Sequence, residues 1–292
     1  MKCLLSPRRN LEFLVIALVL IGLLPSCSYA AAWRTVPYAK LPGIPVDQTS
    51  IDLYGCKRSA DALVVYVHGG AWIKGDKKNV HAMPDYFAGK NVCFASANYP
   101  LQSPDRRSVM DHQLDALAEL NVWLSQANIR PNHFRSISIL GHSAGAHLVA
   151  LLDKRYGWNS GVDNLILMDS ASYDLSKKFQ DSSHGFKQLL AKLLRLDEVS
   201  SGSRQAVLRR FSPALLPARS RLDGNLNVVL LSGYRSAARA SARSLRESYR
   251  SMPGYTVRTL DYPWRHRDFP RKIGTDFDFS RRLISFLRAT AG

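Results

Sequence analysis

Short apolar segments rich in β-branched residues alternate along this chain with segments of helical periodicity. A continuous apolar run such as 62–67 is typical of a strand buried on both faces, as strands of parallel sheets are. The expected strands are 50–54, 62–67, 92–97, 137–140, 165–168, 228–231 and 255–260, and the expected helices are 77–89, 109–126, 144–152, 238–249 and 279–287. This pattern predicts an α/β fold whose mostly parallel sheet carries helices on both faces.

The alternation is interrupted between residues 174 and 216, where the sequence contains no clear strand. One helix is expected there, with Phe186, Leu190 and Leu194 on an apolar face and basic residues elsewhere. We expect that face to pack on the domain, with contact to a membrane surface as the alternative. Residues 31–292 are therefore predicted to form one domain with an insertion at about 174–216.

The first thirty residues have the order of a secretory signal peptide. A positively charged start precedes an apolar run at 11–24 and then small residues up to Ala30. The run is shorter than the roughly 20 residues that a membrane span needs. We expect cleavage after Ala30 and export to the periplasm or the medium. Lipid attachment at Cys27 and an uncleaved membrane anchor are the alternatives.

The chain carries a formal net charge of +17, and the segment 195–292 contributes a net +11 from 18 Arg and 1 Lys against 8 acidic residues. Such an excess fits a surface that meets anionic lipid or polysaccharide, but solvated charged faces give the same composition. Without a recognised binding motif or an interleaved basic and aromatic pattern, nucleic acid is not an expected partner.

The segment Gly141-His142-Ser143-Ala144-Gly145 lies between an expected strand and an expected helix. This is the strand–turn–helix setting that a G-x-S-x-G nucleophile motif requires. Small residues permit the sharp turn, which lifts the serine hydroxyl clear of the sheet, and the helix N-terminus favours a developing negative charge. The pattern predicts Ser143 as a nucleophile.

The segment His68-Gly69-Gly70-Ala71-Trp72 directly follows the expected strand 62–67. Small residues let backbone amides approach a substrate closely. The amides of Gly70, Ala71 and Ala144 are the predicted donors to the oxyanion that forms when Ser143 attacks a carbonyl group.

These two motifs and their order resemble the α/β-hydrolase superfamily. The likeness is to the esterase and arylformamidase-like branch with an HGGxW oxyanion motif, which is related to the hormone-sensitive-lipase-like carboxylesterases. The segment Ser172-Tyr173-Asp174-Leu175 adds to the resemblance, which covers about residues 48–287 and is weak across the insertion. It implies an eight-stranded, mostly parallel sheet with a small helical cap, and a reaction that needs no metal or other cofactor.

The superfamily's chain order of serine, acid and histidine places the base after the last strand. His266 follows the expected strand 255–260 and is the only histidine beyond residue 184. The usual acid position, three residues after a glycine, falls on Ser236. The candidate acids are Asp261, five residues before His266, and Asp169, at the end of the strand 165–168; a Ser–His pair without an acid is the third possibility.

Removal of a signal peptide would leave two cysteines, Cys56 and Cys93. In the superfamily's strand order, strand 50–54 lies antiparallel beside strand 92–97. The resemblance therefore implies that the two cysteines meet at the end of the sheet away from the catalytic loops. An oxidising compartment would allow them to form a structural disulfide.

The predicted reaction is transfer of an acyl group from a small or medium carboxylic ester to water, through an acyl-enzyme on Ser143 with His266 as base. Arylformamides and acetylated sugars are alternative substrates that the resemblance implies, and a lipase acting at lipid surfaces is another reading. An alternative of a different class is a catalytically degenerate hydrolase that binds partners at the cell envelope. Ser236 at the usual acid position favours that alternative, and so does the basic surface.

Overall fold

The computed structural model describes residues 33–101, 110–126, 134–159, 161–217, 224–250 and 252–289. All of them belong to the compact unit Ala31–Gly292. The predicted signal peptide, with its alternative processing sites at Ala30 and Cys27, lies outside the described residues. Within the described ranges, no helix is long and apolar enough to cross a membrane.

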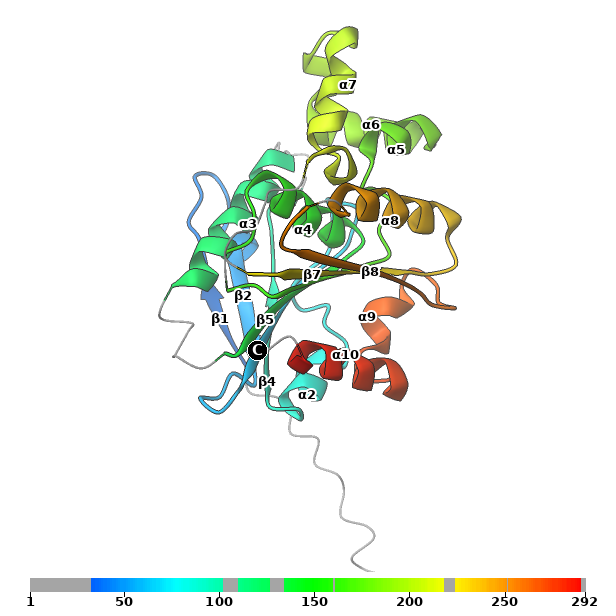
Figure 1. Ribbon diagram of the computed structural model, residues 1–292. Helices are drawn as coiled ribbons and strands as arrows, with labels where there is room; N and C mark the ends of the chain where they lie inside the picture. The colour runs from blue at the N-terminus through cyan, green and yellow to red at the C-terminus, as the bar shows by residue number, and fades with distance from the viewer. Residues whose placement is uncertain are drawn as a thin grey trace, which may run out of the picture. The chain divides into compact units, whose positions relative to one another are not determined.

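Eight strands of the described ranges form one sheet (Figure 1). They are β1 (Trp33–Pro37), β2 (Ser50–Tyr54), β3 (Ala62–Val67), β4 (Val92–Ala97), β5 (Ser136–His142), β6 (Asn164–Met168), β7 (Leu226–Ser232) and β8 (Tyr255–Asp261). Their order is β1-β2-β4-β3-β5-β6-β7-β8, and only the β1–β2 and β2–β4 pairs are antiparallel. The predicted α/β fold with an eight-stranded, mostly parallel sheet is confirmed. The edge strand β1 carries no buried residue, so the apolar pattern gave no sign of it.

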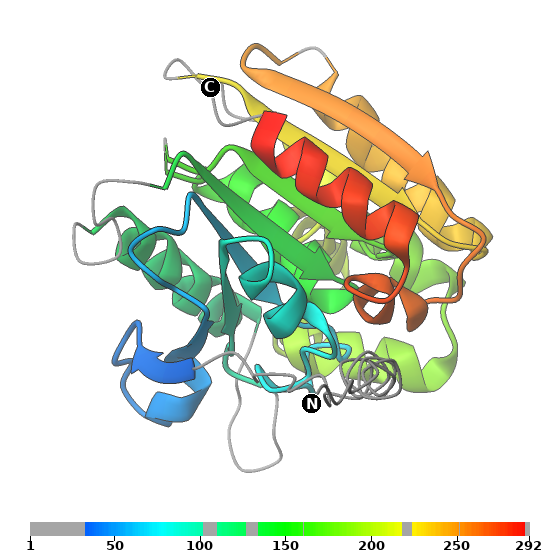
Figure 2. The same cartoon turned by 90° about the horizontal axis from the view of Figure 1, so that it is seen from below.

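Helices cover both faces of the sheet, and a separate apolar cluster lies under each layer. One layer contains α3 (Met110–Ser125), α4 (Ala144–Arg155) and α8 (Ser236–Tyr249), and the other contains α2 (Met83–Ala88), α9 (Asp268–Lys272) and α10 (Phe277–Ala289) (Figures 1 and 2). Along β3, Val65 belongs to the first cluster, whereas Val64 and Tyr66 belong to the second. Both faces of β3 are therefore buried, which explains its uninterrupted apolar sequence.

The helix expected at 77–89 is shorter than predicted. It is α2, Met83–Ala88, and Pro84 lies in its first turn. Proline is tolerated in a first turn, where its missing amide hydrogen has no helical acceptor, but it disfavours helical backbone before it. Residues 77–82 are irregular instead and contribute Asn79 and His81 to the pocket described below.

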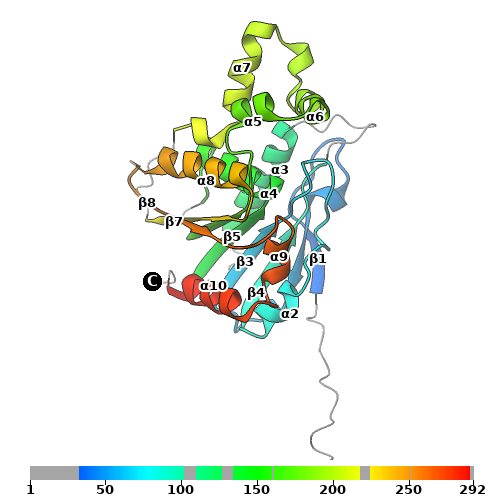
Figure 3. The same cartoon turned by 90° about the vertical axis from the view of Figure 1, so that its right-hand side faces the viewer.

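The insertion at about 174–216 consists of α5 (Leu175–Asp181), α6 (His184–Leu194), α7 (Ser201–Arg210) and short turns. Figure 3 shows these helices on the same side of the sheet as α3, α4 and α8. On α6, Leu190 and Leu193 are fully buried and belong to the core cluster on this side. The expectation that the apolar face packs on the domain is confirmed.

A disulfide bond joins Cys56 and Cys93, whose Cα atoms are 4.3 Å apart. Cys56 lies two residues beyond β2 and Cys93 is the second residue of β4, and these strands are antiparallel neighbours. The end of β2 therefore reaches the start of β4, as the resemblance implied. Ser143 lies at the opposite end of the sheet, where the parallel strands have their carboxyl ends.

Candidate active site

Ser143 occupies a sharp turn between β5 and α4, with φ 55° and ψ −116°. This backbone conformation is strained for a residue with a side chain and is held by a hydrogen bond from the Ser143 amide to the Met168 carbonyl (2.9 Å). The flanking glycines leave no space for a side chain. A Cβ atom on Gly141 would lie 2.6 Å from the Ala146 Cα, and one on Gly145 would lie 2.2 Å from the Val67 carbonyl oxygen. The G-x-S-x-G pattern is thus a packing requirement of this turn.

His266, in the loop after β8, faces Ser143. Its Nε2 lies 2.9 Å from the Ser143 Oγ. The ring of His142 supports this loop by donating from Nε2 to the His266 carbonyl oxygen (2.9 Å). Burial, and then the neighbouring His266, lower the pKa of His142 to about 3, so its ring is neutral and can serve as that donor.

Asp169, directly after β6, contacts the other ring nitrogen of His266. Its Oδ2 lies 2.7 Å from His266 Nδ1, and its side chain is fully buried. Burial raises the pKa of this carboxyl group, but hydrogen bonds from His266 and the Gly233 amide, with the charge and hydrogen bonds of Arg235, outweigh it and bring the pKa to about 2. Asp169 is therefore an ionised carboxylate that orients the imidazole of His266.

Asp169, and not Asp261, contacts His266, which corrects the prediction of Asp261 as the acid. Asp261 is the last residue of β8 and pairs in register with Ser232. Its side chain is 56% exposed and lies 3.7 Å from Arg239. The extended strand keeps its backbone on the sheet ladder, so it cannot fold back onto the histidine five residues later.

The usual acid position, Ser236, is the first residue of α8 and supplies no carboxylate. The alternative candidate, Asp169, reaches His266 because β6 lies between β5 and β7 in the sheet. The carboxyl end of β6 is therefore beside both the Ser143 turn and the β7–α8 loop. The described structure thus brings together Ser143, His266 and Asp169.

Arg235 is a site residue that the sequence gave no reason to select. Its guanidinium donates to Asp169 Oδ2 through Nε (3.1 Å) and Nη2 (2.8 Å), and Nη2 also lies 2.8 Å from His266 Nδ1. A guanidinium cannot accept a hydrogen bond. In the tautomer that carries its proton on Nδ1, Asp169 Oδ2 is therefore the acceptor of that proton, and Nε2 is free to accept a hydrogen bond from the Ser143 hydroxyl.

The loop after β3 lies directly against the Ser143 turn. A Cβ atom on Gly69 would come within 3.0 Å of the Ser143 Cβ, so the close approach requires glycine. The loop is anchored by Trp72, whose ring is buried edge-on against His147 at 5.3 Å between ring centroids. Gly70 and Ala71 line a pocket with Ser143. Ala144 is the first residue of α4, so its amide has no carbonyl partner within that helix.

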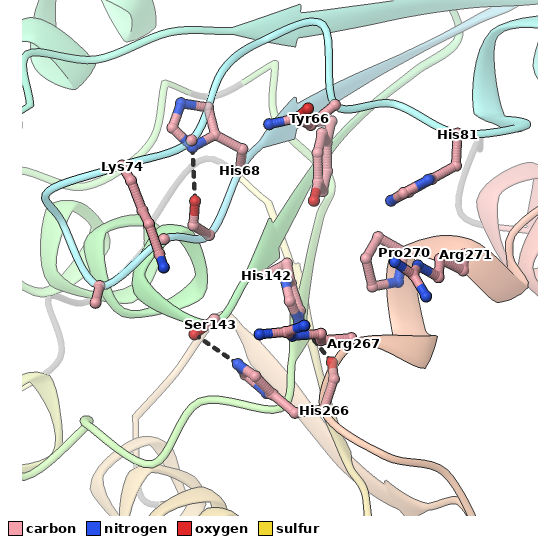
Figure 4. A pocket seen from close by; sticks show the side chains of 15 residues that line it. Tyr66, His68, Lys74, His81, His142, Ser143, His266, Arg267, Pro270 and Arg271 are labelled. Atoms are coloured by element: carbon pink, nitrogen blue, oxygen red, sulfur yellow. Dashed lines mark hydrogen bonds between the residues drawn. The ribbon is translucent and has the colours of Figure 1, made fainter.

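A pocket of about 530 Å³ opens over Ser143 and His266 (Figure 4). Its walls come from the β3 loop, the segment around His81 and the segment 266–271, which includes most of α9. A smaller pocket of about 90 Å³ also borders Ser143 and is lined in part by Phe186 and Lys178 of the insertion. No group of three metal-ligating side chains occurs in the described part of the chain.

The family model described as BD-FAE matches residues 51–160. Several solved esterases have similar structures. Esterase B from Lactobacillus rhamnosis is 18% identical over 90% of this chain and 87% of that chain, with a TM-score of 0.61. Thermogutta terrifontis esterase 2 phosphonylated by sarin is 16% identical over 88% of this chain and 93% of that chain, with a TM-score of 0.62. A truncated carbohydrate esterase from gut microbiota is 14% identical over 91% of this chain and 99% of that chain, with a TM-score of 0.64. No curated protein matches this chain in sequence.

Proposed function

We propose that this chain, which has the α/β-hydrolase fold, is a serine hydrolase that cleaves carboxylic esters. The observation that carries the proposal is the continuous hydrogen-bonded series from Asp169 through His266 to Ser143. A serine hydroxyl becomes a nucleophile when a base takes its proton and an acid holds that base in the correct tautomer. The three structural neighbours described above are named esterases, which agrees with this chemistry.

In the proposed reaction, His266 Nε2 accepts the Ser143 proton while Oγ attacks the ester carbonyl carbon. The negative charge that develops on the carbonyl oxygen is stabilised by the Ala144 amide at the start of α4 and by amides of the Gly70–Ala71 turn. His266 then returns the proton to the departing alcohol oxygen, which leaves an acyl group on Ser143. Water repeats the sequence, with His266 as base, and releases the carboxylic acid.

The competing proposal of a degenerate, non-catalytic hydrolase was supported first by the missing acid at Ser236 and second by the basic surface. Asp169 now provides a buried, ionised carboxylate at 2.7 Å from His266 Nδ1. The main reason for expecting an inactive site is therefore lost, and the basic surface is equally compatible with an active enzyme.

Hydrolysis of 4-nitrophenyl acetate and butanoate, together with labelling by a fluorophosphonate, tests the proposal. We expect turnover of at least one ester and one phosphonyl group per chain, located on Ser143 by peptide mass analysis, because the probe reacts only with an activated serine. Heat-denatured protein and Ser143→Ala should remain unlabelled. Native protein that neither turns over an ester nor takes up the probe would rule the proposal out, and faster cleavage of an arylformamide than of any ester would favour the amide-hydrolase alternative.

We also propose that the chain is exported, because a Cys56–Cys93 disulfide is a feature of oxidising compartments. Intact-mass analysis of protein recovered from the periplasm or medium is expected to find a chain that starts at Ala31 with both thiols oxidised. A mass increased by lipid on Cys27 would identify the lipoprotein alternative. A full-length chain with two free thiols in the cytoplasm would contradict export.

A further inference from the structure

Three cationic side chains line the 530 Å³ pocket beside Ser143, and none of its described lining residues is acidic. The cations are Lys74, Arg267 and Arg271. They come from two segments, namely the β3 loop, which contributes Lys74, and the segment around α9, where Arg267 caps the helix and Arg271 lies in its last turn. In Figure 4 Lys74 and Arg267 extend into the space near Ser143 from opposite sides, and Arg271 lies farther along the same wall.

The three pocket cations have no ion-pair partner among the described residues. By contrast, Arg155 and Arg210 share Asp111, and Arg239 pairs with Asp261. The acidic residues nearest in sequence have other partners. Asp268 accepts from the Arg265 amide, Asp76 accepts from the Lys78 amide, and Asp276 pairs with Lys272. The charge of Asp76 also acts on the lining residue His68: burial lowers the pKa of His68, and Asp76 opposes that effect.

The positive charge of the pocket affects the pKa of His81, which lies in the pocket wall. The pKa of His81 is lowered by burial and then by the positive charge of Arg271. His81 is therefore a neutral group that can donate or accept a hydrogen bond without adding to the charge. The cations that an incoming ligand meets are Lys74, Arg267 and Arg271.

The chain as a whole is basic, so an exposed cation has no meaning by itself. The pocket differs from the general surface because its cations converge in a concavity, where walls of low dielectric concentrate the field. They also flank the reacting serine: Arg267 directly follows His266, and the Lys74 amide closes the β3 loop by bonding to the Gly70 carbonyl. The smaller pocket is lined by two cations, Arg235 and Lys178. Arg235 is paired with Asp169, so Lys178 is the cation of that pocket that is not paired with the active-site carboxylate.

We propose that this pocket binds the anionic end of the substrate, so that the enzyme prefers esters bearing a carboxylate, sulfate or phosphate near the scissile bond. The inference rests on the proposed ester hydrolysis and specifies its substrate class. Arginine and lysine side chains form charge-assisted hydrogen bonds with such groups, and these bonds are stronger than those between neutral groups. The anion could belong to the acyl part or to the alcohol part, since the pocket opens over Ser143 and His266 alike.

Matched pairs of esters distinguish these two sources. Mono-4-nitrophenyl adipate and 4-nitrophenyl heptanoate differ in a charge on the acyl part, and 4-acetoxybenzoate and 4-acetoxybenzamide differ in a charge on the alcohol part. After correction for spontaneous hydrolysis, we expect kcat/KM to be at least about tenfold higher for the anion in one of the pairs. Raising the salt concentration should reduce that preference and leave the neutral esters little affected, because ions screen charge.

Single substitutions locate the anion. Lys74→Gln and Arg271→Gln are each expected to lower the ratio of anionic to neutral kcat/KM by about three- to tenfold, since each removes one charge-assisted contact. Arg246→Gln, which removes an exposed cation from α8 outside both pockets, is the matched control and should leave the ratio as in the wild type. Loss of the preference in Lys178→Gln alone would place the anion in the smaller pocket and overturn the assignment.

The two proposals fail in different ways. Wild-type protein that hydrolyses neutral esters through Ser143 but shows no anionic preference in either pair retains the proposed function and refutes the anion pocket. If no ester is cleaved, titration calorimetry with adipate and adipamide still tests the pocket. Wild type should bind adipate more tightly than adipamide, and Arg271→Gln should lose that difference; equal binding of the two compounds would refute the pocket.

Discussion

Replacing Ser143 by alanine is expected to lower kcat for ester hydrolysis about 10⁶-fold, and replacing His266 by alanine should cost nearly as much. The hydroxyl is the group that forms the acyl-enzyme, and the imidazole at 2.9 Å is the contact in this site that can take its proton. Because the two residues act as one unit, the double variant should be little worse than either single variant. Stopped and continuous assays of 4-nitrophenyl butanoate hydrolysis would measure these losses.

The controls for this prediction are an exposed serine and an exposed histidine away from the site. Ser203→Ala on α7 and His184→Ala at the start of α6 should retain wild-type kcat. Circular dichroism and the urea midpoint would show that the active-site variants remain folded. A folded Ser143→Ala protein that keeps more than about a tenth of the wild-type kcat would mean that another group is the nucleophile, since removal of a true nucleophile costs several powers of ten.

Replacing Asp169 by asparagine is expected to lower kcat about 10⁴-fold while changing KM much less. The carboxylate accepts the Nδ1 hydrogen of His266 and stabilises the imidazolium that forms when Ser143 gives up its proton. An amide can present its NH₂ group to Nδ1 instead, which favours the tautomer with the proton on Nε2. A proton on Nε2 prevents His266 from acting as base toward Ser143.

The matched control is Asp261→Asn, which makes the same chemical change at the end of β8. Asp261 is exposed and lies near Arg239, so kcat should stay within about twofold of the wild type, as for other surface ion pairs of small effect. Steady-state kinetics of both variants, with folding verified by urea unfolding, decides between the two aspartates. Collapse of Asp261→Asn together with near-normal Asp169→Asn would reverse the assignment.

The sequence predicted best those strands whose apolar residues follow directly from burial on both faces. β3 and β4 are buried on both faces and read as continuous apolar runs, and their predicted bounds match the structure. The exposed edge strand β1 and the short helix α9 have no such pattern and were not predicted. The helix predicted at 77–89 is shorter in the structure because Pro84 disfavours helical backbone in the residues before it.

For the site, the sequence by itself determined the residues whose role depends on local geometry. Ser143 could be identified from the flanking glycines, which a strand–turn–helix corner requires. The β3 loop could be identified from its glycines, one of which makes a close contact with the Ser143 turn. His266 could be selected because the superfamily's chain order left one histidine in the right place. The disulfide between Cys56 and Cys93 followed from the strand order that the resemblance implied.

Only the tertiary structure decided which acid serves His266 and what surrounds the nucleophile. Asp169 and His266 are 97 residues apart, and they meet because the carboxyl ends of parallel strands lie along one edge of the sheet. Arg235 and the pocket cations Lys74 and Arg271 were likewise indistinguishable in sequence from the many other basic residues. Sequence spacing reports on neighbours along one strand or helix, whereas hydrogen bonds and electric fields depend on distances between elements that the fold brings together.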